Sequence, residues 1–289
     1  MGLVQALLPL ALLLMASGLA APATADDPGL AVYWGRHKEE GSLREACDTG
    51  RYTTVIITFY NVFGHQKGRY GLDISGHSVA AVGADIKHCQ SKGVTVLLAI
   101  GGQGGEYSLP SSQSAADVAD NLWNAYLGGR RAGVPRPFGD AAVDGVDFFI
   151  DQGGADHYEE LARLLNGYNK YYRGRVGVLL TATTRCSYPD HRLEKALATG
   201  LFARIHVRMF GDAQCTMSPR YSWEKWAAAY PGSKVYIGLV ASWEQDSAWM
   251  FQKDLYYEML QFVRNLPNYG GLAIYDRYYD KKANYTGEG

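Results

Sequence analysis

The sequence reads Asp144-Gly145-Val146-Asp147-Phe148-Phe149-Ile150-Asp151 in the middle of the 289-residue chain. Its short apolar run predicts a buried strand over residues 145–150. Successive side chains of a strand point to opposite faces, so Asp147, Phe149 and Asp151 share one face. The segment therefore predicts a strand that carries acidic groups on one side.

Seven further apolar runs of similar length flank this strand, at 30–34, 55–59, 95–100, 178–182, 204–209, 234–239 and 271–275. Helix-periodic stretches lie between the runs, at 79–91, 115–127, 157–172, 223–230 and 252–265. This alternation is typical of parallel βα units, and eight units in about 250 residues predict an α/β fold, a single-domain (β/α)8 TIM barrel. The alternative is an open doubly wound sheet, but no G-x-G-x-x-G follows the first strand.

The charge balance limits the classes of partner. The chain has 28 Lys and Arg against 29 Asp and Glu, which gives a net charge of −1 and excludes the basic footprint of a general nucleic-acid binder. With 47% hydrophobic and 20% charged residues, the composition is that of a globular protein. We expect a monomer that needs no cofactor and has no membrane span.

Residues 1–25 contain no charged side chain, and an apolar run within them is followed by small residues that end in Ala23-Thr24-Ala25. This pattern predicts a secretory signal peptide over 1–25, with a mature barrel domain over 26–289. A membrane anchor is the alternative, but the apolar run is well short of the ~20 residues that a spanning helix needs.

Four cysteines allow three pairings in an oxidising compartment. Short loop closure favours Cys47–Cys89 and Cys186–Cys215. No C-x-x-C spacing or nearby His pair supports a zinc site, so we expect structural disulfides and no metal. Asn284 opens the sequon Asn284-Tyr285-Thr286, which predicts an exposed glycosylation site.

In a TIM barrel the functional side chains lie at the carboxyl ends of the strands. There, residues 144–151 resemble the D-G-x-D-x-D-x-E signature of glycoside hydrolase family 18. The resemblance covers the whole mature chain, is nearest to plant class III chitinases, and extends to Gly101-Gly102, Thr58-Phe59-Tyr60 and Gly270-Gly271 with Tyr275-Asp276-Arg277-Tyr278. It implies a site where the signature Glu is the general acid and the preceding Asp orients the N-acetyl group of the substrate.

The chain departs from that pattern at four of the positions that the resemblance makes catalytic. Phe149 replaces the Asp that orients the acetamide, and Asp151 replaces the acid Glu with a shorter side chain. Phe210 and Tyr275 replace a Tyr on strand six and a Trp on strand eight. A phenyl ring cannot hold the acetamide, and a proton donor displaced by about 1 Å can cost ~100-fold in rate. We therefore predict that the chain is not an enzyme.

A fifth departure concerns charge. Arg208 stands where chitinases have a neutral Gln, so a permanent cation faces Asp151 across the barrel mouth. This arrangement predicts a buried ion pair. An adjacent cation lowers the pKa of a carboxyl group, whereas a general acid must be protonated to act.

Three longer stretches resemble the cereal xylanase inhibitor proteins, which are inactive relatives of these chitinases: GSLREACD (41–48), GADIKHCQSKG (83–93) and VPRPFGD (134–140). Arg208, the four cysteines and the Asn284 sequon match that family too. The resemblance implies a secreted, apoplastic plant defence protein. Its partners would be microbial endo-1,4-β-xylanases of families 10 and 11.

Two surfaces carry cations suited to the acidic cleft of a xylanase. Lys253 matches the Lys that the inhibitors insert into family 10 enzymes. The loop with Lys170, Tyr171, Arg173 and Arg175 matches their family 11 contact, but Tyr171 falls where the inhibitory Arg stands. We therefore expect family 10 inhibition through Lys253 and weak or absent family 11 inhibition.

Two alternatives remain open. A lectin could keep the old cleft and bind chitin or another glycan on aromatic platforms supplied by Tyr33, Trp34 and Tyr275. A storage or stress protein of the same barrel would have no specific ligand. Retention on chitin beads or on an immobilised family 10 xylanase separates the lectin from the inhibitor.

Overall fold

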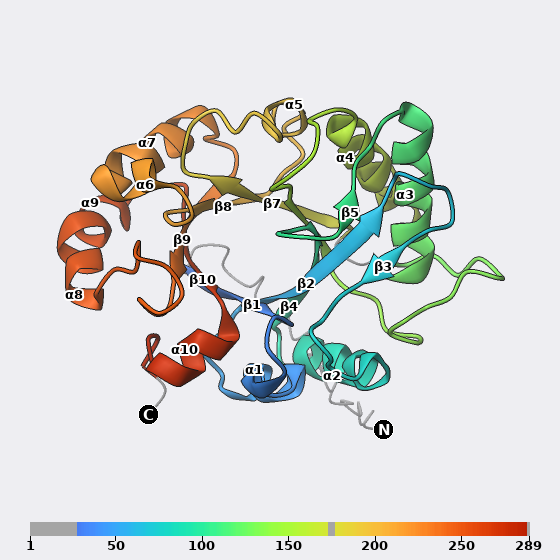
Figure 1. The fold of residues 1–289 in the computed structure, drawn as a ribbon, viewed down its shortest axis with the longest axis horizontal. Coiled ribbons are helices and arrows are strands. Elements are labelled where there is room, and N and C mark those ends of the chain that lie inside the picture. Colours follow the sequence, from blue (N-terminus) through green and yellow to red (C-terminus); the bar gives the residue numbers. More distant parts are fainter. Residues whose placement is uncertain (1–27, 173–176, 288–289) are drawn as a thin grey trace, which may run out of the picture.

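The computed structural model describes residues 28–172 and 177–287. Eight parallel strands close into a ring, because β1 pairs with both β2 and β10. Figure 1 looks along this ring, with helices around its outside. The strands are β1 (Gly29–Trp34), β2 (Thr54–Phe63), β4 (Thr95–Gly101), β6 (Gly145–Phe149), β7 (Leu179–Arg185), β8 (Arg204–Arg208), β9 (Lys234–Val240) and β10 (Tyr269–Tyr275). The predicted (β/α)8 barrel is confirmed.

The helices of the described chain are α1 (Leu43–Asp48), α2 (Val79–Ser91), α3 (Ser112–Ala125), α4 (Tyr158–Gly167), α5 (Glu194–Leu197), α6 (Ala213–Met217), α7 (Pro219–Ala229), α8 (Gln252–Leu255), α9 (Gln261–Val263) and α10 (Arg277–Ala283). Short 3-10 turns lie at Lys38–Glu40 and Tyr168–Tyr171. A π-helical turn at Tyr256–Leu260 joins α8 to α9. Within this part of the chain, no helix is both long and apolar enough to cross a membrane.

Several predicted ends differ from the observed ones for local reasons. Helix α3 begins before the predicted Ala115, because the Ser111 hydroxyl accepts a hydrogen bond from the Ser114 backbone and caps it. Helix α7 begins at Pro219, a residue suited to a first turn. Strand β2 runs to Phe63, beyond the predicted Phe59, because two short strands pair with its end: β3 (Gly71–Leu72) and β5 (Glu106–Tyr107).

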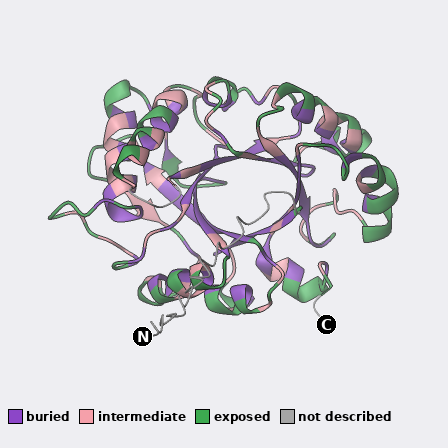
Figure 2. Cartoon of the chain, turned by 180° about the vertical axis from the view of Figure 1, so that it is seen from behind, coloured by how far each residue is buried: buried purple, intermediate pink, exposed green. Residues whose placement is uncertain are grey.

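The apolar side chains form two layers. The barrel interior holds Ala31, Tyr33, Ile56, Phe59, Leu97, Ala99, Phe149, Tyr236 and Ala273. A larger cluster fills the space between the strands and the helices. Figure 2 shows the ring of strands buried and the outer helix faces exposed. A strand buried on both faces needs an apolar run without polar alternation, which explains why such runs located the strands.

Both predicted disulfides are present. Cys47–Cys89 joins α1 to α2, and Cys186–Cys215 joins the end of β7 to α6. The Asp212 carboxylate lies close to the sulfurs of Cys186 and Cys215. These sulfurs are bonded to each other, so the group offers no thiolate to a metal ion.

Candidate functional site

The first acidic residue of the strand-four segment lies deep in the barrel. Asp147 is fully buried and accepts hydrogen bonds from the hydroxyls of Thr181 (2.5 Å) and Thr183 (2.7 Å). Nδ1 of His206 lies 3.2 Å from one of its oxygens, and the Tyr33 hydroxyl lies 2.6 Å from that of Thr183. Burial, and after it the charge of Asp147, raises the pKa of Tyr33 well above its usual value. Asp147 therefore anchors a buried polar network and does not face a substrate.

Phe149 lies above this network and fills the centre of the barrel. Its ring is buried and meets Phe59 at 5.1 Å, Tyr33 at 6.0 Å and Tyr275 at 6.1 Å between centroids. The Arg208 guanidinium carbon lies 4.5 Å from the centroid of the same ring. A cation over an aromatic face is attracted to it, so Phe149 both fills the space and supports Arg208.

The Gly101-Gly102 pair beside Phe149 owes its identity to close packing. The Gly102 amide donates a hydrogen bond of 2.7 Å to the Phe149 carbonyl oxygen. A Cβ at Gly102 would lie 2.6 Å from the Phe59 ring, and φ is +84°, a conformation that favours glycine. The glycine at position 102 is therefore required for the close packing of Phe59 and Phe149.

Asp151 lies at the mouth between two arginines. Its Oδ1 is 2.9 Å from Arg208 Nη2 and 3.1 Å from Arg185 Nη2. The Arg208 side chain is 4% exposed and that of Arg185 is 43% exposed, so one cation lies inside the mouth and the other at its rim. Burial alone would raise the pKa of Asp151, but the hydrogen bonds and charges of the two arginines hold it below its usual value. Asp151 is ionised at neutral pH and cannot act as a proton donor.

Sequence reasoning missed Arg185. The predicted strand ended at residue 182, whereas β7 continues to Arg185, which lies level with Arg208 in the register of the two strands. A strand extended by three residues would have placed both cations at one depth. The predicted ion pair between Asp151 and Arg208 is therefore part of a three-residue cluster that includes Arg185.

The remaining two aromatic positions, Phe210 and Tyr275, contact each other at the mouth. Phe210 is buried, and its ring centroid lies 5.6 Å from that of the partly buried Tyr275. Burial raises the pKa of Tyr275 to about 12. Tyr33 and Trp34 are 2% and 1% exposed, so their proposed role as sugar-stacking platforms is wrong. They point into the barrel and the layer around it, where a glycan cannot reach them.

Asp276 is a second buried carboxyl group near the mouth. It is 1% exposed and caps α10 by accepting a hydrogen bond of 3.2 Å from the Tyr279 amide. Nε2 of His37 lies 3.7 Å from its other oxygen. Burial raises the pKa of Asp276 to about 7. Since the group is enclosed, its carboxyl group is not accessible from the barrel mouth.

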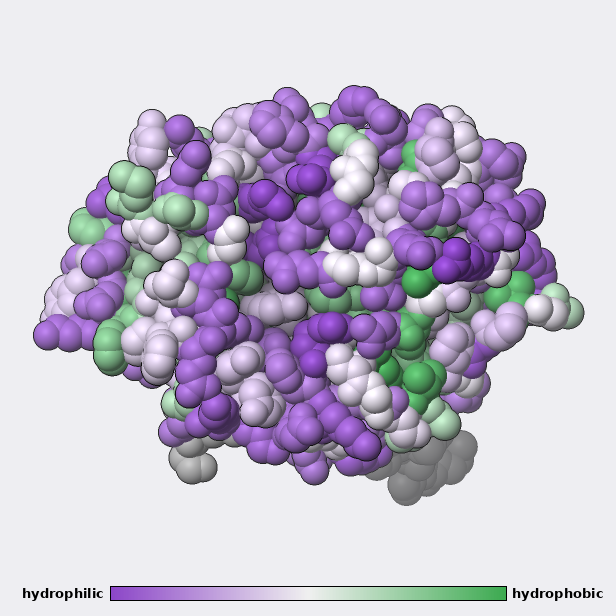
Figure 3. Space-filling view, in the orientation of Figure 1, coloured by the Kyte–Doolittle hydropathy of each residue, from purple (hydrophilic) through white to green (hydrophobic). Residues whose placement is uncertain are grey.

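Lys253 lies on the outer surface, at the second position of α8. It is exposed, and its ammonium has no ion-pair partner within residues 28–172 and 177–287. Phe251, 57% exposed, and the exposed Tyr256 and Tyr257 lie within four positions of it. Figure 3 shows hydrophobic side chains at the surface on the side of the molecule where α8 and α9 lie. This segment therefore combines an exposed cation with exposed aromatic residues close to it in the sequence, and tyrosines are frequent in interface hot spots.

The second predicted surface is only partly described. Lys170 and Tyr171 lie in the 3-10 turn after α4, with Tyr171 61% exposed and the Lys170 ammonium 5.0 Å from its ring centroid. Tyr171 also leans on Trp123, at 6.1 Å between centroids. Arg173 and Arg175 lie outside the described residues.

Asn284 follows α10 in a left-handed conformation and is exposed. The Thr286 hydroxyl of the same sequon donates to Asp280 at 2.9 Å. The exposed amide is accessible to a glycan, and its occupancy stays a prediction.

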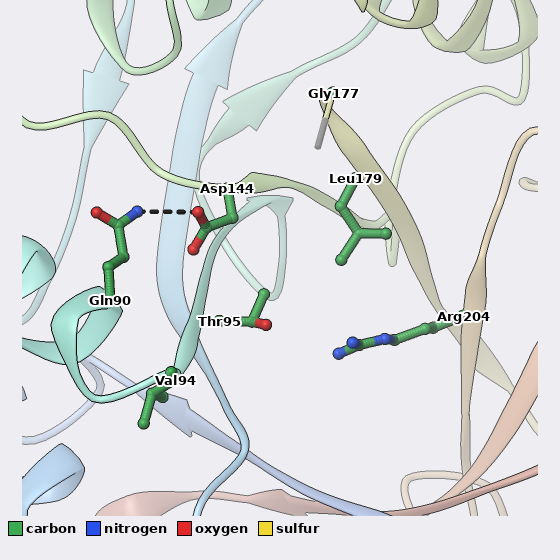
Figure 4. A pocket seen from close by; sticks show the side chains of 8 residues that line it. Gln90, Val94, Thr95, Asp144, Gly177, Leu179 and Arg204 are labelled. Atoms are coloured by element: carbon green, nitrogen blue, oxygen red, sulfur yellow. Dashed lines mark hydrogen bonds between the residues drawn. The ribbon is translucent and has the colours of Figure 1, made fainter. Parts of the chain in front are cut away.

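The opposite end of the barrel has a cavity of about 370 Å³ at the amino ends of β4, β6, β7 and β8. Figure 4 shows Asp144 accepting a hydrogen bond from Gln90, and Arg204 reaching in from the other side. Asp144 also accepts from the Val96 amide at 2.8 Å, so it ties β4 to β6. Residues at this end of a TIM barrel act in stability, and Asp144 fits that role.

The chain is similar to known proteins in sequence and in fold. Residues 29–253 match the family described as glycosyl hydrolases family 18. The chain is similar to xylanase inhibitor protein 2 of Oryza sativa subsp. japonica, with 87% identity over 292 residues and all of both chains covered. It is 50% identical to xylanase inhibitor protein 1 of Triticum aestivum over 96% of this chain and 94% of that one. The crystal structure of the xylanase and alpha-amylase inhibitor protein from Scadoxus multiflorus matches with a TM-score of 0.83 and 33% identity, over 91% of this chain and 97% of that one.

Proposed function

Since the chain belongs to glycosyl hydrolases family 18, and within it to the xylanase inhibitor proteins, we propose that it inhibits microbial endo-1,4-β-xylanases. The observation that carries this proposal is the 87% identity, over the whole chain, to a rice protein of that name. The barrel mouth supports it, because Asp151 is held in an ion pair with the nearly buried Arg208 and is not left available to a substrate.

Loss of chitinase chemistry follows from three contacts. Asp151 is held ionised by Arg208 and Arg185, so no proton reaches a leaving group from this position. Phe149 fills the place of the acetamide, and its ring is packed against Phe59. The barrel therefore serves as a support for surfaces that bind another protein.

Lys253 is the proposed anchor for family 10 enzymes. A xylanase cleft contains two catalytic carboxylates, and an ammonium placed between them forms charge-assisted hydrogen bonds as the interface is desolvated. Lys253 is exposed and needs to break no ion pair in the described structure before it binds. The neighbouring rings of Phe251 and Tyr257 would surround the contact and exclude water.

The family 11 surface is proposed to be weak. Tyr171 stands where an inhibitory Arg would be needed, and its ring is engaged by Lys170 and Trp123. A phenol offers one hydroxyl to a carboxylate, whereas a guanidinium offers a bidentate, charged contact.

The proposal also covers where the protein acts and in which oligomeric state. Residues 1–25 are proposed to direct secretion to the apoplast, where the two disulfides are stable and a microbial xylanase is encountered. The protein is proposed to act as a monomer in plant defence. A lectin that uses the old cleft loses support, because Tyr33 and Trp34 are buried.

The deciding experiment is a panel of family 10 and family 11 xylanases, assayed with and without the purified secreted protein. Inhibition of a family 10 enzyme at a stoichiometry near one to one supports the proposal. Full xylanase activity across the panel, at micromolar concentrations of a folded protein, refutes it.

A further inference from the structure

Two adjoining hollows lie along α3, on the flank of the barrel at the right of Figure 1. Their volumes are about 180 and 570 Å³, and both are lined by Lys67, Tyr70 and Asp117. One wall is the loop between β2 and β3, and the other is the loop of residues 131–135 after α3. We call this continuous feature the α3 groove. Its larger part is within the size range of small-molecule sites, about 300 to 1,000 Å³.

The charges that line the α3 groove are balanced within its walls. The Lys67 ammonium lies 3.2 Å from Asp117, and Arg131 Nη1 lies 2.7 Å from Asp120. Two cations and two carboxylates leave no net charge. A phosphate, a nucleic acid or a strongly basic peptide would therefore gain little Coulomb energy from binding here.

Tyr70 supplies an aromatic surface held in a fixed position. Its hydroxyl donates to the Asp117 carbonyl oxygen at 3.1 Å, and its ring stacks on Tyr60 at 6.2 Å between centroids. The side chain is half-buried and lines both hollows, so part of the ring faces the groove. An aromatic face that is fixed before binding loses little entropy when a ligand stacks on it.

Asn121 supplies an oriented donor. Its Oδ1 accepts a hydrogen bond of 3.0 Å from the buried Tyr60 hydroxyl, which fixes the amide plane. Its Nδ2 has no partner among the described residues. The groove therefore presents carboxylate acceptors and amide or guanidinium donors side by side, beside a ring. Sugar hydroxyls, which donate and accept at once, match this alternation.

We propose that the α3 groove binds a neutral oligosaccharide, with one sugar ring stacked on Tyr70 and hydroxyls bonded to Asn121, Asp117 and Arg131. This site is separate from the barrel mouth and from Lys253. It does not depend on the proposed inhibition of xylanases. Two adjoining hollows favour several linked sugar rings over a monosaccharide.

The test is isothermal titration of the full-length mature protein with xylohexaose, cellohexaose and chitohexaose. We expect at least one of them to bind, and Tyr70→Ala to weaken that binding at least about fivefold by removing the platform. Asn121→Asp keeps the acceptor for Tyr60 and removes the donor, so it should weaken binding by a similar factor. Tyr70→Phe keeps the ring and should retain most of the affinity.

Two controls separate the groove from the rest of the surface. Tyr221→Ala removes an exposed tyrosine on α7, and Lys253→Ala removes the proposed xylanase anchor. Neither should change oligosaccharide affinity. Failure of all three oligosaccharides to bind would overturn the proposal. So would binding that is unchanged in folded Tyr70→Ala and Asn121→Asp proteins, because it would place the sugar elsewhere.

Discussion

Arg208 reaches across the barrel mouth to Asp151, with Nη2 2.9 Å from Oδ1, while its guanidinium carbon lies over the Phe149 ring, 4.5 Å from the centroid. The position that an active relative would use for its proton donor is thus engaged as half of an ion pair. The other side of the same carboxylate is held by Arg185. The contact ties the end of β6 to β7 and β8, so it belongs to the stability of the barrel.

We predict no chitinase turnover, and none after the single change Asp151→Glu. A longer acid would still be ionised between Arg208 and Arg185, and Phe149 would still occupy the acetamide position. The measurement is fluorophore release from a chitotrioside, with an active family 18 chitinase as positive control. Release above background by the unmutated protein would contradict the prediction.

Loss of Asp151 should destabilise the fold more than loss of Arg208. Asp151→Leu leaves the nearly buried Arg208 without its partner, which should cost about 3 kcal/mol, whereas Arg208→Met leaves Asp151 paired with Arg185. The double variant should be more stable than Asp151→Leu alone. Urea unfolding of the three variants measures the order. Equal stabilities of all variants and the parent would mean that the pair is solvated.

Asp276 should make stability fall as the pH rises. Its pKa is about 7 in the folded protein and near 3.8 in the unfolded chain, so ionisation is penalised only in the folded state. The penalty is absent below about pH 4, grows between about pH 4 and 7, and can reach up to about 4 kcal/mol above that range. Asp276→Asn can still cap α10 but does not titrate.

The difference in unfolding free energy between Asp276→Asn and the parent should therefore grow in favour of the variant from pH 4.5 to 7.5. Urea titrations at four pH values test this. The neighbouring side chains His37, Glu40 and Arg36 are common to both proteins, so their contribution cancels in the difference. A difference that does not change with pH would show that Asp276 is already ionised at low pH.

Lys253→Ala should raise the inhibition constant against a family 10 xylanase at least about tenfold, because truncation of a charged group in a desolvated interface costs ~2 kcal/mol or more. The residue is exposed, so the melting temperature should not change. Lys87→Ala, on α2, removes an exposed lysine from another face, where it pairs with Asp140, and should inhibit like the parent. Family 10 inhibition indifferent to Lys253 would show that another surface makes the contact.

Tyr171→Arg should create or strengthen inhibition of a family 11 xylanase. The position is exposed at a helical turn, so a guanidinium there can reach a cleft carboxylate. Arg173→Ala in the parent should have no effect unless the adjacent loop already makes that contact. Potent family 11 inhibition by the parent that is insensitive to Arg173 would refute the assignment of this loop.

The strands were predictable because those of a closed parallel barrel are apolar on both faces, which leaves runs such as 95–100 and 234–239 plain in the sequence. The departure at Phe149 was equally visible, since strand periodicity fixed the face on which it lies. How deeply each inward-facing side chain is buried could not be predicted from the sequence. Periodicity places Tyr33 inward but does not say that the Asp147 network and Phe149 would enclose it.

Long-range partners were also beyond the sequence pattern. His206 and Thr183 meet Asp147 from two other strands, and Arg185 meets Asp151 only because β7 extends past its apolar run. Such contacts depend on which strands lie side by side in the closed barrel and on how far each strand extends, and the periodicity of a single strand gives neither. The same limit applies to Asp276, whose enclosure comes from chain segments far apart in the sequence.

Phe149 contacts Arg208, and Arg208 pairs with Asp151. A substitution at any one of the three positions therefore changes the surroundings of the other two. An aspartate restored at position 149 would remove the ring beneath Arg208 and place a third carboxylate on a face that already carries Asp147. A neutral side chain restored at position 208 would leave Asp151 with the rim cation alone. We expect each of these changes alone to destabilise the barrel, since each removes a contact on which the other two residues depend. Substitutions on the outer surface of the barrel leave these three contacts untouched, so binding surfaces such as that around Lys253 can change without disturbing the mouth.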